Sequence, residues 1–390
     1  MSTAASPNNA QSPQPSSPPS VEDEAIAIVC NRAFHQCLWL PKTPSHDRLR
    51  VTFATTSNFS DYTLPVALYC VPMFGSRYGS LNWDHTAKIA GVRMIAVDRP
   101  GMGGSSLVPL NLRVKVWIET VPAVLQALDV KHIDLLFSHS AGTIYAMNTM
   151  YTLRHLLHPQ RPSVVFFAPC VQVEHSQATL IQVASKIPNS IVGGWSPLNK
   201  FIQQRITPMT SWSGGIFTTL AETFQSTPGT ADTTDTATPG ERHGTSEAVG
   251  AAIDELSTQW FFVEDTTAGT EEARMCLRKC EAGAWGVCED YAQFVRMFGE
   301  LERGRREAGG SEARAVERVK VKVFFAESDV MIGKIGRRYF EECWRQRGVE
   351  EWVDVETVDL SGTNHDSSIG DLKKGGMKGM LEELGRKARE

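Results

Sequence analysis

One short stretch of the chain has the residue types of a serine nucleophile on a tight turn. Ser140 stands in Ser-His-Ser-Ala-Gly (138–142), which differs from the pattern G-x-S-x-G only in having serine at its first small position. An apolar run precedes the motif and residues with helical spacing follow it. The sequence therefore predicts a sharp strand-to-helix turn that would expose the Ser140 hydroxyl. A pattern this short also arises by chance, so its surroundings must decide whether it has chemical meaning.

The surroundings of the motif are short apolar runs that alternate with amphipathic segments. Runs of this kind separated by helices predict βαβ units and a mostly parallel sheet. In such a sheet, reactive groups lie in loops beyond the carboxyl ends of the strands, and Ser140 directly follows the strand expected at 132–138. Further strands are expected at 49–56, 64–71, 92–98, 162–169, 319–328 and 351–360, and helices at 21–39, 113–128, 143–157, 337–348 and 370–389.

One interval breaks this alternation. Residues 171–318 are far more than the roughly 12 residues that a crossover between parallel strands requires. They contain apolar helical segments at 177–187 and 198–206, and then a polar low-complexity stretch at 226–247 that is not expected to pack. We interpret the interval as a cap over the active edge of the sheet, interrupted by a flexible loop. Four tryptophans could line a substrate cavity beneath the cap or form the cap's own core: Trp195, Trp212, Trp260 and Trp285.

The expected organisation is a core in two parts, with a tail and a cap. Residues 1–20 are rich in proline, serine, asparagine and glutamine, and we expect them to form a disordered tail. Because this tail has no basic start and no apolar centre, it is not predicted to be a secretory signal peptide. The remaining boundaries are a first part of the core at 21–170, the cap at 171–290 with its flexible loop at 226–247, and a second part of the core at 291–390.

The composition is typical of a soluble globular protein. The 390 residues are 42% hydrophobic and 21% charged, with a formal net charge of −5. This charge provides no basic excess for nucleic acid, and no apolar run approaches the roughly 20 residues that cross a bilayer. The eight cysteines are scattered except for Cys276, Cys280 and Cys288, which have no histidine nearby at zinc-finger spacing. We interpret them as reduced thiols of an intracellular, cytoplasmic protein rather than as a zinc site, and expect no metal and no organic cofactor.

Four motifs together resemble those of a known family. Their sequences are similar to the turn after the fourth strand, the nucleophile turn, the acid loop and the histidine loop of α/β-hydrolases of the epoxide-hydrolase, haloperoxidase and esterase type. They occur in the family's order, and the resemblance covers roughly residues 49–170 and 290–385. It implies an α/β-hydrolase fold: a mostly parallel central sheet flanked by helices, with a cap inserted between the sixth and seventh core strands. The four motifs are VDRPGMGGSS (97–106), FSHSAG (137–142), FFAESDVMI (324–332) and SGTNHDS (361–367).

The resemblance also implies a catalytic triad of Ser140, Asp329 and His365. α/β-hydrolases carry the triad in the order serine, acid, histidine, which these three residues satisfy. In that arrangement His365 takes the proton of the Ser140 hydroxyl, and Asp329 holds the imidazole in the correct tautomer. The serine also separates this chain from relatives that hydrolyse epoxides or haloalkanes, since those need aspartate as the nucleophile.

Other ionisable residues compete for these roles. Glu327 precedes Asp329 by two residues and is its main rival as the acid. Asp98 precedes Ser140 in the chain, so the order of the motifs argues against it, and we expect it to tether the turn around Gly101. His139 is expected to pack, and Asp366, adjacent to His365, would have difficulty curling back to its ring. Glu174 and His175 could be a relocated acid or substrate contacts, but are expected on the cap surface.

The loop expected to bind the oxyanion departs from the family pattern. Relatives usually carry His-Gly-x after the third strand, and this chain has Val71-Pro72-Met73 instead. Proline lacks an N–H, but the family's donor falls on Met73, which has one. We therefore expect the backbone N–H groups of Met73 and Ala141 to form the oxyanion hole.

The sequence thus predicts a serine hydrolase that cleaves an ester, a thioester or a related carboxylic derivative through an acyl-enzyme on Ser140. The expected partner is a small apolar or acyl-bearing substrate. Transfer to an acceptor other than water, or C–C hydrolysis, would use the same triad. A non-catalytic homologue that binds a small apolar ligand is the alternative of another class, and the change at Val71-Pro72 is its main support.

Overall fold

The computed structural model describes residues 18–186, 237–308 and 317–390, and its centre is an eight-stranded sheet. The strand order is β1-β2-β4-β3-β5-β6-β7-β8. The first three strands in this order pair antiparallel, and the pairs from β4 to β8 are parallel. The strands are β1 (Gln36–Leu40), β2 (Leu49–Thr55), β3 (Val66–Cys70), β4 (Arg93–Val97), β5 (Leu135–His139), β6 (Ser163–Phe167), β7 (Val319–Ser328) and β8 (Val353–Asn364).

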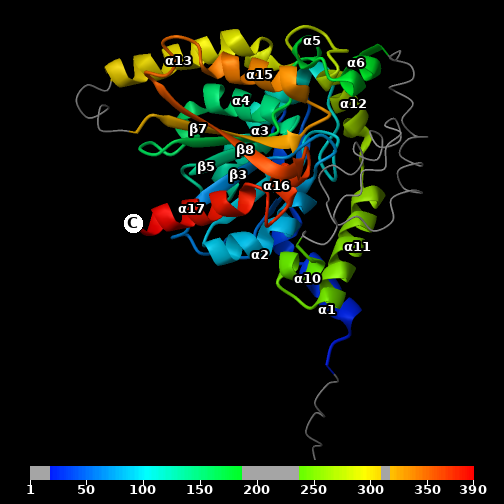
Figure 1. The fold of residues 1–390 in the computed structure, drawn as a ribbon. Coiled ribbons are helices and arrows are strands. Elements are labelled where there is room, and N and C mark those ends of the chain that lie inside the picture. The colour runs from blue at the N-terminus through cyan, green and yellow to red at the C-terminus, as the bar shows by residue number, and fades with distance from the viewer. Residues whose placement is uncertain (1–17, 187–236, 309–316) are drawn as a thin grey trace, which may run out of the picture.

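Helices cover both faces of this sheet (Figure 1). One face carries α3 (Arg113–Ala127), α4 (Gly142–Thr152), α13 (Tyr291–Ala308) and α15 (Gly333–Trp344). The other face carries α2 (Leu81–Ala90) and α17 (Met377–Arg389), with the single turn α16 (Ser367–Gly370) between β8 and α17. This three-layer arrangement confirms the predicted α/β class with a mostly parallel central sheet.

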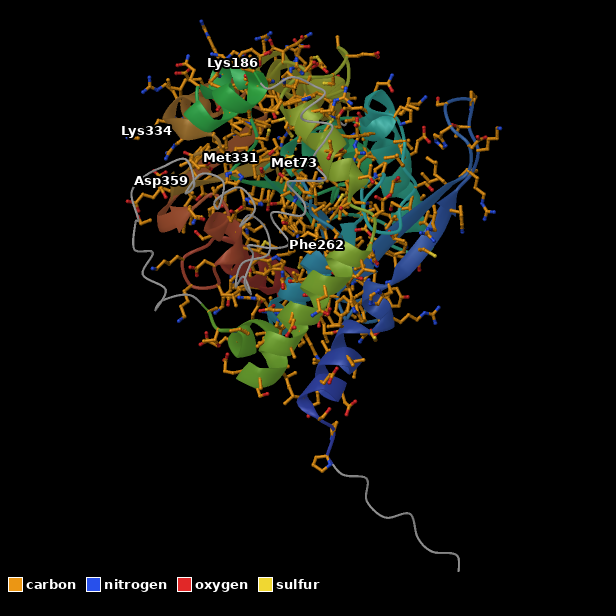
Figure 2. The ribbon with its side chains drawn as sticks, turned by 90° about the vertical axis from the view of Figure 1, so that its right-hand side faces the viewer. Met73, Lys186, Phe262, Met331, Lys334 and Asp359 are labelled. Atoms are coloured by element: carbon orange, nitrogen blue, oxygen red, sulfur yellow. The ribbon has the colours of Figure 1, made fainter. Side chains whose placement is uncertain are left out.

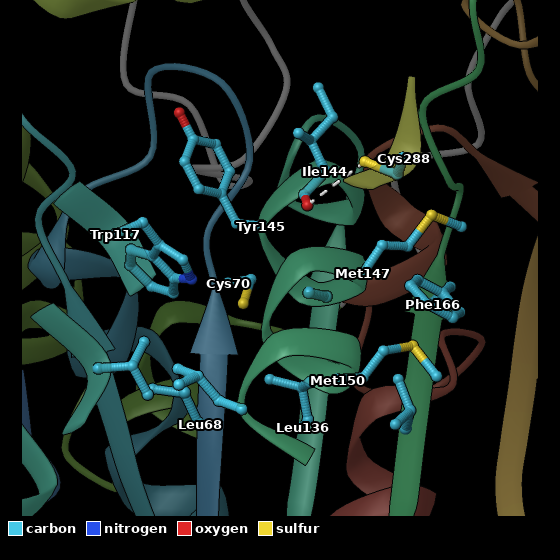
Figure 3. Close-up of a cluster of buried hydrophobic side chains, with 14 of the residues drawn as sticks. Leu68, Cys70, Trp117, Leu136, Ile144, Tyr145, Met147, Met150, Phe166 and Cys288 are labelled. Atoms are coloured by element: carbon cyan, nitrogen blue, oxygen red, sulfur yellow. Dashed lines mark hydrogen bonds between the residues drawn. The ribbon is translucent and has the colours of Figure 1, made fainter. Parts of the chain in front are cut away.

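Side chains of the central strands alternate between the two layers. In β3, Leu68 and Cys70 belong to the cluster under α3 and α4, whereas Ala67 and Tyr69 belong to the cluster over α2 and α17. Figure 3 shows the first cluster, in which side chains of α4 pack above those of β3, β5 and β6. Because strands buried on both faces have no polar side to expose, their sequences are nearly continuous apolar runs. This explains why these strands were predictable.

The long interval between β6 and β7 adds further helices at the edge of the sheet. Figure 1 shows α11 and α12 on the side toward which the parallel strands run. The first helix of the chain, α1 (Val21–Val29), packs against α11. The additional helices are α5 (Val173–Ser176), α6 (Thr179–Lys186), α10 (Pro239–His243), α11 (Glu247–Val263) and α12 (Thr267–Cys276).

Two expectations for individual elements are wrong. The helix predicted at 21–39 ends at Val29, and Gln36–Leu40 forms β1, because the edge of β2 offers it a hydrogen-bonding partner. The stretch at 226–247 was expected not to pack; residues 226–236 lie outside the described residues, but 237–247 contain α10 with a capping box at Thr238. Arg242 and His243 of α10 both pair with Asp254 on α11. Polar composition hid this helix, because ion pairs rather than apolar side chains hold it.

The other expected elements agree with the structure or lie outside it. The predicted strands and the helices at 113–128, 143–157, 177–187, 337–348 and 370–389 are confirmed apart from shifts at their ends, and Pro122 lies inside α3 without ending it. The segment 198–206, most of the expected tail, Trp195 and Trp212 fall outside the described residues. Within the tail, Ser20 caps α1. None of the helices within the described ranges has the length and apolar character to span a membrane.

Candidate active site

Ser140 lies on a strained turn between β5 and α4. Its φ of 52° is in the left-handed region, which non-glycine residues adopt at an energetic cost and mostly at functional positions. Neighbouring backbone holds the turn: the N–H of Ser140 donates to the carbonyl of Phe167 at 3.1 Å, and its carbonyl accepts from the N–H of Cys170 at 3.2 Å. Gly142 is required here, because a Cβ on it would lie 2.0 Å from the carbonyl oxygen of Cys70.

Asp329 and His365 are brought together by the ends of β7 and β8. The Nδ1–H of His365 donates to Oδ2 of Asp329 at 2.8 Å. The other carboxylate oxygen, Oδ1, accepts from the backbone N–H groups of Met331 and Ile332 at 2.9 and 3.0 Å. Both oxygens are therefore fixed, and the imidazole is oriented with Nε2 away from the carboxylate. Figure 2 labels Met331 on the side of the molecule where the parallel strands end.

The His365 backbone is attached next to the serine. The Nε2–H of His139, the residue before Ser140, donates to the carbonyl of His365 at 3.0 Å. The Ser368 hydroxyl donates to the same carbonyl at 2.8 Å. His139 is fully buried, and burial, with the nearby charge of His365, lowers its pKa to about 3, so it stays neutral. It is thus a packing residue that joins the histidine loop to the nucleophile turn.

Asp329 and His365 each stabilise the charged form of the other. Burial of His365 opposes its protonation, but the charge and hydrogen bond of Asp329 outweigh this and raise the pKa of His365 to about 9. Burial likewise disfavours the Asp329 carboxylate, yet His365 and the two backbone N–H groups hold its pKa below the usual value. Asp329 is therefore ionised whenever the imidazole carries or gains a proton.

The competing acids have other partners. Glu327 accepts from the backbone N–H of Gly362 at 2.6 Å and does not reach the histidine. Asp98 accepts from the Arg77 guanidinium and from the Thr52 hydroxyl, which anchors the turn that follows β4. Asp366 is buried beside His365, and neither of its oxygens has a hydrogen-bond partner among the described residues.

Glu174 and His175, which follow β6, have other partners. Glu174 is exposed and lies 4.0 Å from Arg278, and the ring of His175 stacks on Tyr339 at 3.7 Å between ring centroids. Both contacts are structural.

The loop after β3 follows the carboxyl end of that strand, which pairs in parallel with β5, the strand before Ser140. Within the described residues, no hydrogen bond occupies the backbone N–H of Met73 or of Ala141. The N–H of Gly75 donates to the Pro72 carbonyl at 2.8 Å, and Phe74 has a φ of 59°, so the loop turns sharply. Met73 is half-buried and is labelled in Figure 2 on the side where the strands end.

Sequence reasoning missed the residues that support this loop. Arg99 is fully buried and donates to the carbonyls of both Val71 and Pro72. It also pairs with Glu272 of α12, which is equally buried. The only sequence signal was an arginine directly after an apolar strand, and that signal does not reveal that the side chain turns inward.

The residues able to approach a metal ion overlap this site. Among the described residues, the nitrogen and oxygen ligand atoms of His139, His365 and Asp366 lie within 4.8 Å of one another. His365 already belongs to the hydrogen-bonded pair with Asp329. Cys276, Cys280 and Cys288 form no such group in the described part of the chain, and all three are free thiols.

The two described tryptophans of the interval, Trp260 and Trp285, differ in their burial. Trp285 is fully buried in the cluster shared with α4, and its indole N–H donates to the Met275 carbonyl at 2.9 Å. Trp260 packs partly buried against two smaller clusters. Trp285 is therefore a core residue.

Comparisons with known proteins agree with the fold. The sequence matches the alpha/beta hydrolase family over residues 68–367. A comparison with curated protein sequences finds no match. Among solved structures, the chain is similar to esterase E22, with a TM-score of 0.51 and 12% identity over 90% of this chain and 99% of that one.

Two further solved structures are similar to this chain. Epoxide hydrolase A from Mycobacterium thermoresistibile has a TM-score of 0.46 and 13% identity, covering 90% of this chain and 98% of that one. The thioesterase domain from the curacin biosynthetic pathway has a TM-score of 0.48 and 11% identity, covering 89% and 99%. The family match spans most of the chain, and the sheet has the expected arrangement. The chain therefore belongs to the alpha/beta hydrolase family.

Proposed function

We propose that this chain is a serine hydrolase that cleaves an ester, a thioester or a related carboxylic derivative through an acyl-enzyme on Ser140. The observation that carries the proposal is the hydrogen bond of 2.8 Å between His365 Nδ1 and Asp329, combined with the attachment of His365 beside the nucleophile turn. A carboxylate fixed by two backbone N–H groups is well suited to hold one imidazole tautomer.

The reaction would proceed in two halves. His365 Nε2 removes the hydroxyl proton as Ser140 attacks the substrate carbonyl, and Asp329 stabilises the imidazolium that results. The imidazolium then gives its proton to the leaving group as the tetrahedral intermediate collapses to an acyl-enzyme. Water, activated by the same imidazole, releases the acid and restores Ser140.

The negative oxygen of each tetrahedral intermediate would bind to the N–H groups of Met73 and Ala141. Both groups lack a hydrogen-bond partner within the described residues, which leaves them available to a ligand. Donors that are fixed before the reaction stabilise the transition state without reorganisation. The residues at 171–290 would act as a cap that selects a small apolar or acyl-bearing substrate.

The proposal is tested by labelling with a fluorophosphonate and by a series of p-nitrophenyl esters of increasing acyl length. We expect mass spectrometry to locate the phosphonate on Ser140, and the Ser140→Ala variant to be unlabelled and inactive. Ser138→Ala is the matched control, since Ser138 is buried in the same strand and its hydroxyl has no hydrogen-bond partner among the described residues.

The same experiment separates the alternatives. A folded chain that is neither labelled nor active would favour the non-catalytic ligand-binding homologue. Labelling at Ser140 without ester hydrolysis, followed by turnover once an alcohol or amine acceptor is added, would indicate an acyltransferase.

A further inference from the structure

The segment that leads into α12, and the start of α12 itself, pack on the turn after β4 and on the loop after β3. The N–H of Gly103 donates to the carbonyl of Asp265 at 2.8 Å, and the N–H of Ala268 donates to the carbonyl of Gly101 at 3.1 Å. Gly269 lies so close to the Phe74 ring that an added Cβ would be 1.9 Å from Cε1. The start of α12 is therefore docked on the core rather than separated from it.

A buried cluster of charges strengthens this docking. Oε1 and Oε2 of Glu272 accept from Nε and Nη2 of Arg99 at 2.5 and 2.6 Å. Oε1 also accepts from Arg113 at 2.8 Å and from the Tyr145 hydroxyl at 3.3 Å. Arg99, Arg113 and Glu272 have no exposed surface. Burial opposes the ionisation of Glu272, but the charges of Arg99 and Arg113 outweigh it and lower its pKa, so the carboxylate stays charged.

Arg99 transmits this anchoring to the oxyanion loop. The guanidinium donates to the carbonyl oxygens of Val71 and Pro72 while it pairs with Glu272. The Pro72 carbonyl and the Met73 N–H belong to one peptide unit, which is planar and, in this chain, trans. Fixing the direction of the carbonyl therefore fixes the opposite direction of the N–H. A charged donor on the carbonyl also polarises the unit and makes its N–H a stronger donor.

We propose that Arg99 and Glu272 are positioning residues of the reaction: they orient the Pro72–Met73 peptide unit so that its N–H meets the oxyanion. This rests on the proposed acyl-transfer function and extends it, because it makes a helix of the interval between β6 and β7 part of the catalytic geometry. Neither side chain touches the reacting atoms. Their contribution is to hold the Met73 N–H in position. Catalysis is sensitive to displacements of such groups by about 1 Å.

The first test is Arg99→Lys, which keeps the positive charge but loses the fork that holds two carbonyls and a carboxylate at once. Using the p-nitrophenyl ester that the wild type hydrolyses fastest, we expect kcat per active site to fall roughly 10- to 100-fold with KM changed less than about threefold. Active sites are counted by fluorophosphonate titration, so partial unfolding does not imitate the effect. The matched control is Arg154→Lys, since Arg154 forms a buried pair with Glu302 at 2.6 Å after the far end of α4.

A trifluoromethyl ketone of matched chain length provides the decisive readout. It forms a hemiketal with the serine, and its oxyanion occupies the same place as that of the transition state. We expect its Ki for Arg99→Lys to rise by the factor by which kcat/KM falls, and to be unchanged for Arg154→Lys. A role limited to stability would leave Ki unchanged for the folded fraction.

A second variant reaches the same loop without changing a charge. Gly269→Ala forces the Phe74 ring to move, whereas Gly304→Ala on α13 meets no heavy atom within 4 Å and serves as its control. We expect Gly269→Ala to lower kcat and to raise the Ki of the ketone by a similar factor. If Arg99→Lys does not fold, the Gly269→Ala variant alone tests whether the position of this loop controls catalysis. Values of kcat and Ki within about threefold of the wild type in the folded variants would overturn the proposal. Failure of the wild type to be labelled or to hydrolyse any ester would instead overturn the proposed function.

Discussion

Asp329 and Glu327 lie two residues apart at the end of one strand, yet their carboxylates have different partners. Asp329 accepts the Nδ1–H of His365, whereas Glu327 accepts a backbone N–H from Gly362 across the β7–β8 pair. β7 ends at Ser328, so Asp329 already belongs to the turn that follows. The difference of two positions decides which carboxylate can support the imidazole.

This geometry predicts unequal effects of removing the two charges. Asp329→Asn should lower kcat by about 10⁴-fold, because the amide would hold His365 in the wrong tautomer. Glu327→Gln should lower kcat less than about tenfold, since an amide oxygen can still accept the Gly362 N–H. Steady-state kinetics of both variants with one ester tests this. The reverse order of effects would make Glu327 the acid.

The raised pKa of His365 predicts the pH dependence of activity. The general base must be neutral, and a pKa raised from 6.5 to about 9 means that the neutral fraction grows as pH rises through that range. We expect kcat/KM to increase with pH along a limb that lies above pH 6.5. Asp329→Asn removes the largest influences that raise the pKa of His365 and leaves burial to oppose its protonation, so the residual activity should reach its plateau at lower pH. A wild-type plateau already reached at pH 6 would contradict the interpretation.

Ser140 should also affect stability through its backbone. A left-handed residue with a side chain costs roughly 1–2 kcal/mol relative to glycine. Ser140→Gly should therefore unfold at higher urea than Ser140→Ala, by about 1 kcal/mol, while both lose at least about 10³-fold in kcat. Urea denaturation of the two variants is the measurement. Equal stabilities would show that surrounding contacts remove the strain.

Asp366 provides a prediction about stability and pH. Burial raises its pKa from 3.8 to about 6. Above about pH 6 the folded chain therefore carries an unfavourable buried carboxylate. Below about pH 3.8 the carboxyl is neutral in both the folded and the unfolded chain, so the cost is absent. Asp366→Asn should thus stabilise the fold at pH 7 by up to about 3 kcal/mol and change it little at pH 4. Asp354→Asn, at an exposed position on β8, is the control. The same gain at both pH values would exclude charge as the cause.

The ion pairs of α10 can be tested directly. Asp254 joins Arg242 at 2.7 Å and His243 at 2.8 Å, and all three side chains are largely buried. Asp254→Ala should cost about 1–3 kcal/mol of unfolding free energy, because it removes the carboxylate that accepts from both Arg242 and His243. Glu307→Ala, which breaks an exposed pair with Arg303, should cost less than about 0.5 kcal/mol. Residues 237–246 belong to the stretch that was expected from its composition not to pack, and replacing them by a Gly-Ser linker should likewise be destabilising because it removes α10.

Much of the core was predictable because strands that are buried on both faces of the sheet have mostly apolar sequences. Strands such as Val66–Cys70 and Leu135–His139 are buried along their whole length, and the position of Ser140 follows from where the second of them ends. The pairing of Asp329 rather than Glu327 with the histidine was favoured by motif order but remained open. It depends on the course of a turn, which sequence patterns do not specify.

What the sequence did not reveal are contacts between distant segments. Gln36–Leu40 carries little strand signal of its own, and only the free edge of β2 makes it a strand. Likewise, Glu272 lies in a helix with few apolar residues, yet it is fully buried because two arginines far away in the chain meet it. Such pairings appear only once the chain is folded.

The contacts of α12 also bear on how this protein could be recombined with its relatives. A chimera that exchanged only residues 171–290 would remove Glu272 and leave Arg99 and Arg113 as buried charges without a counterion. It would also put a foreign helix against the Phe74 ring, which here requires a glycine. A functional exchange would therefore have to include this interval, the turn at 98–104 and the start of α3. These segments are separated in the sequence, so a chimera with a single crossover point cannot transfer them together.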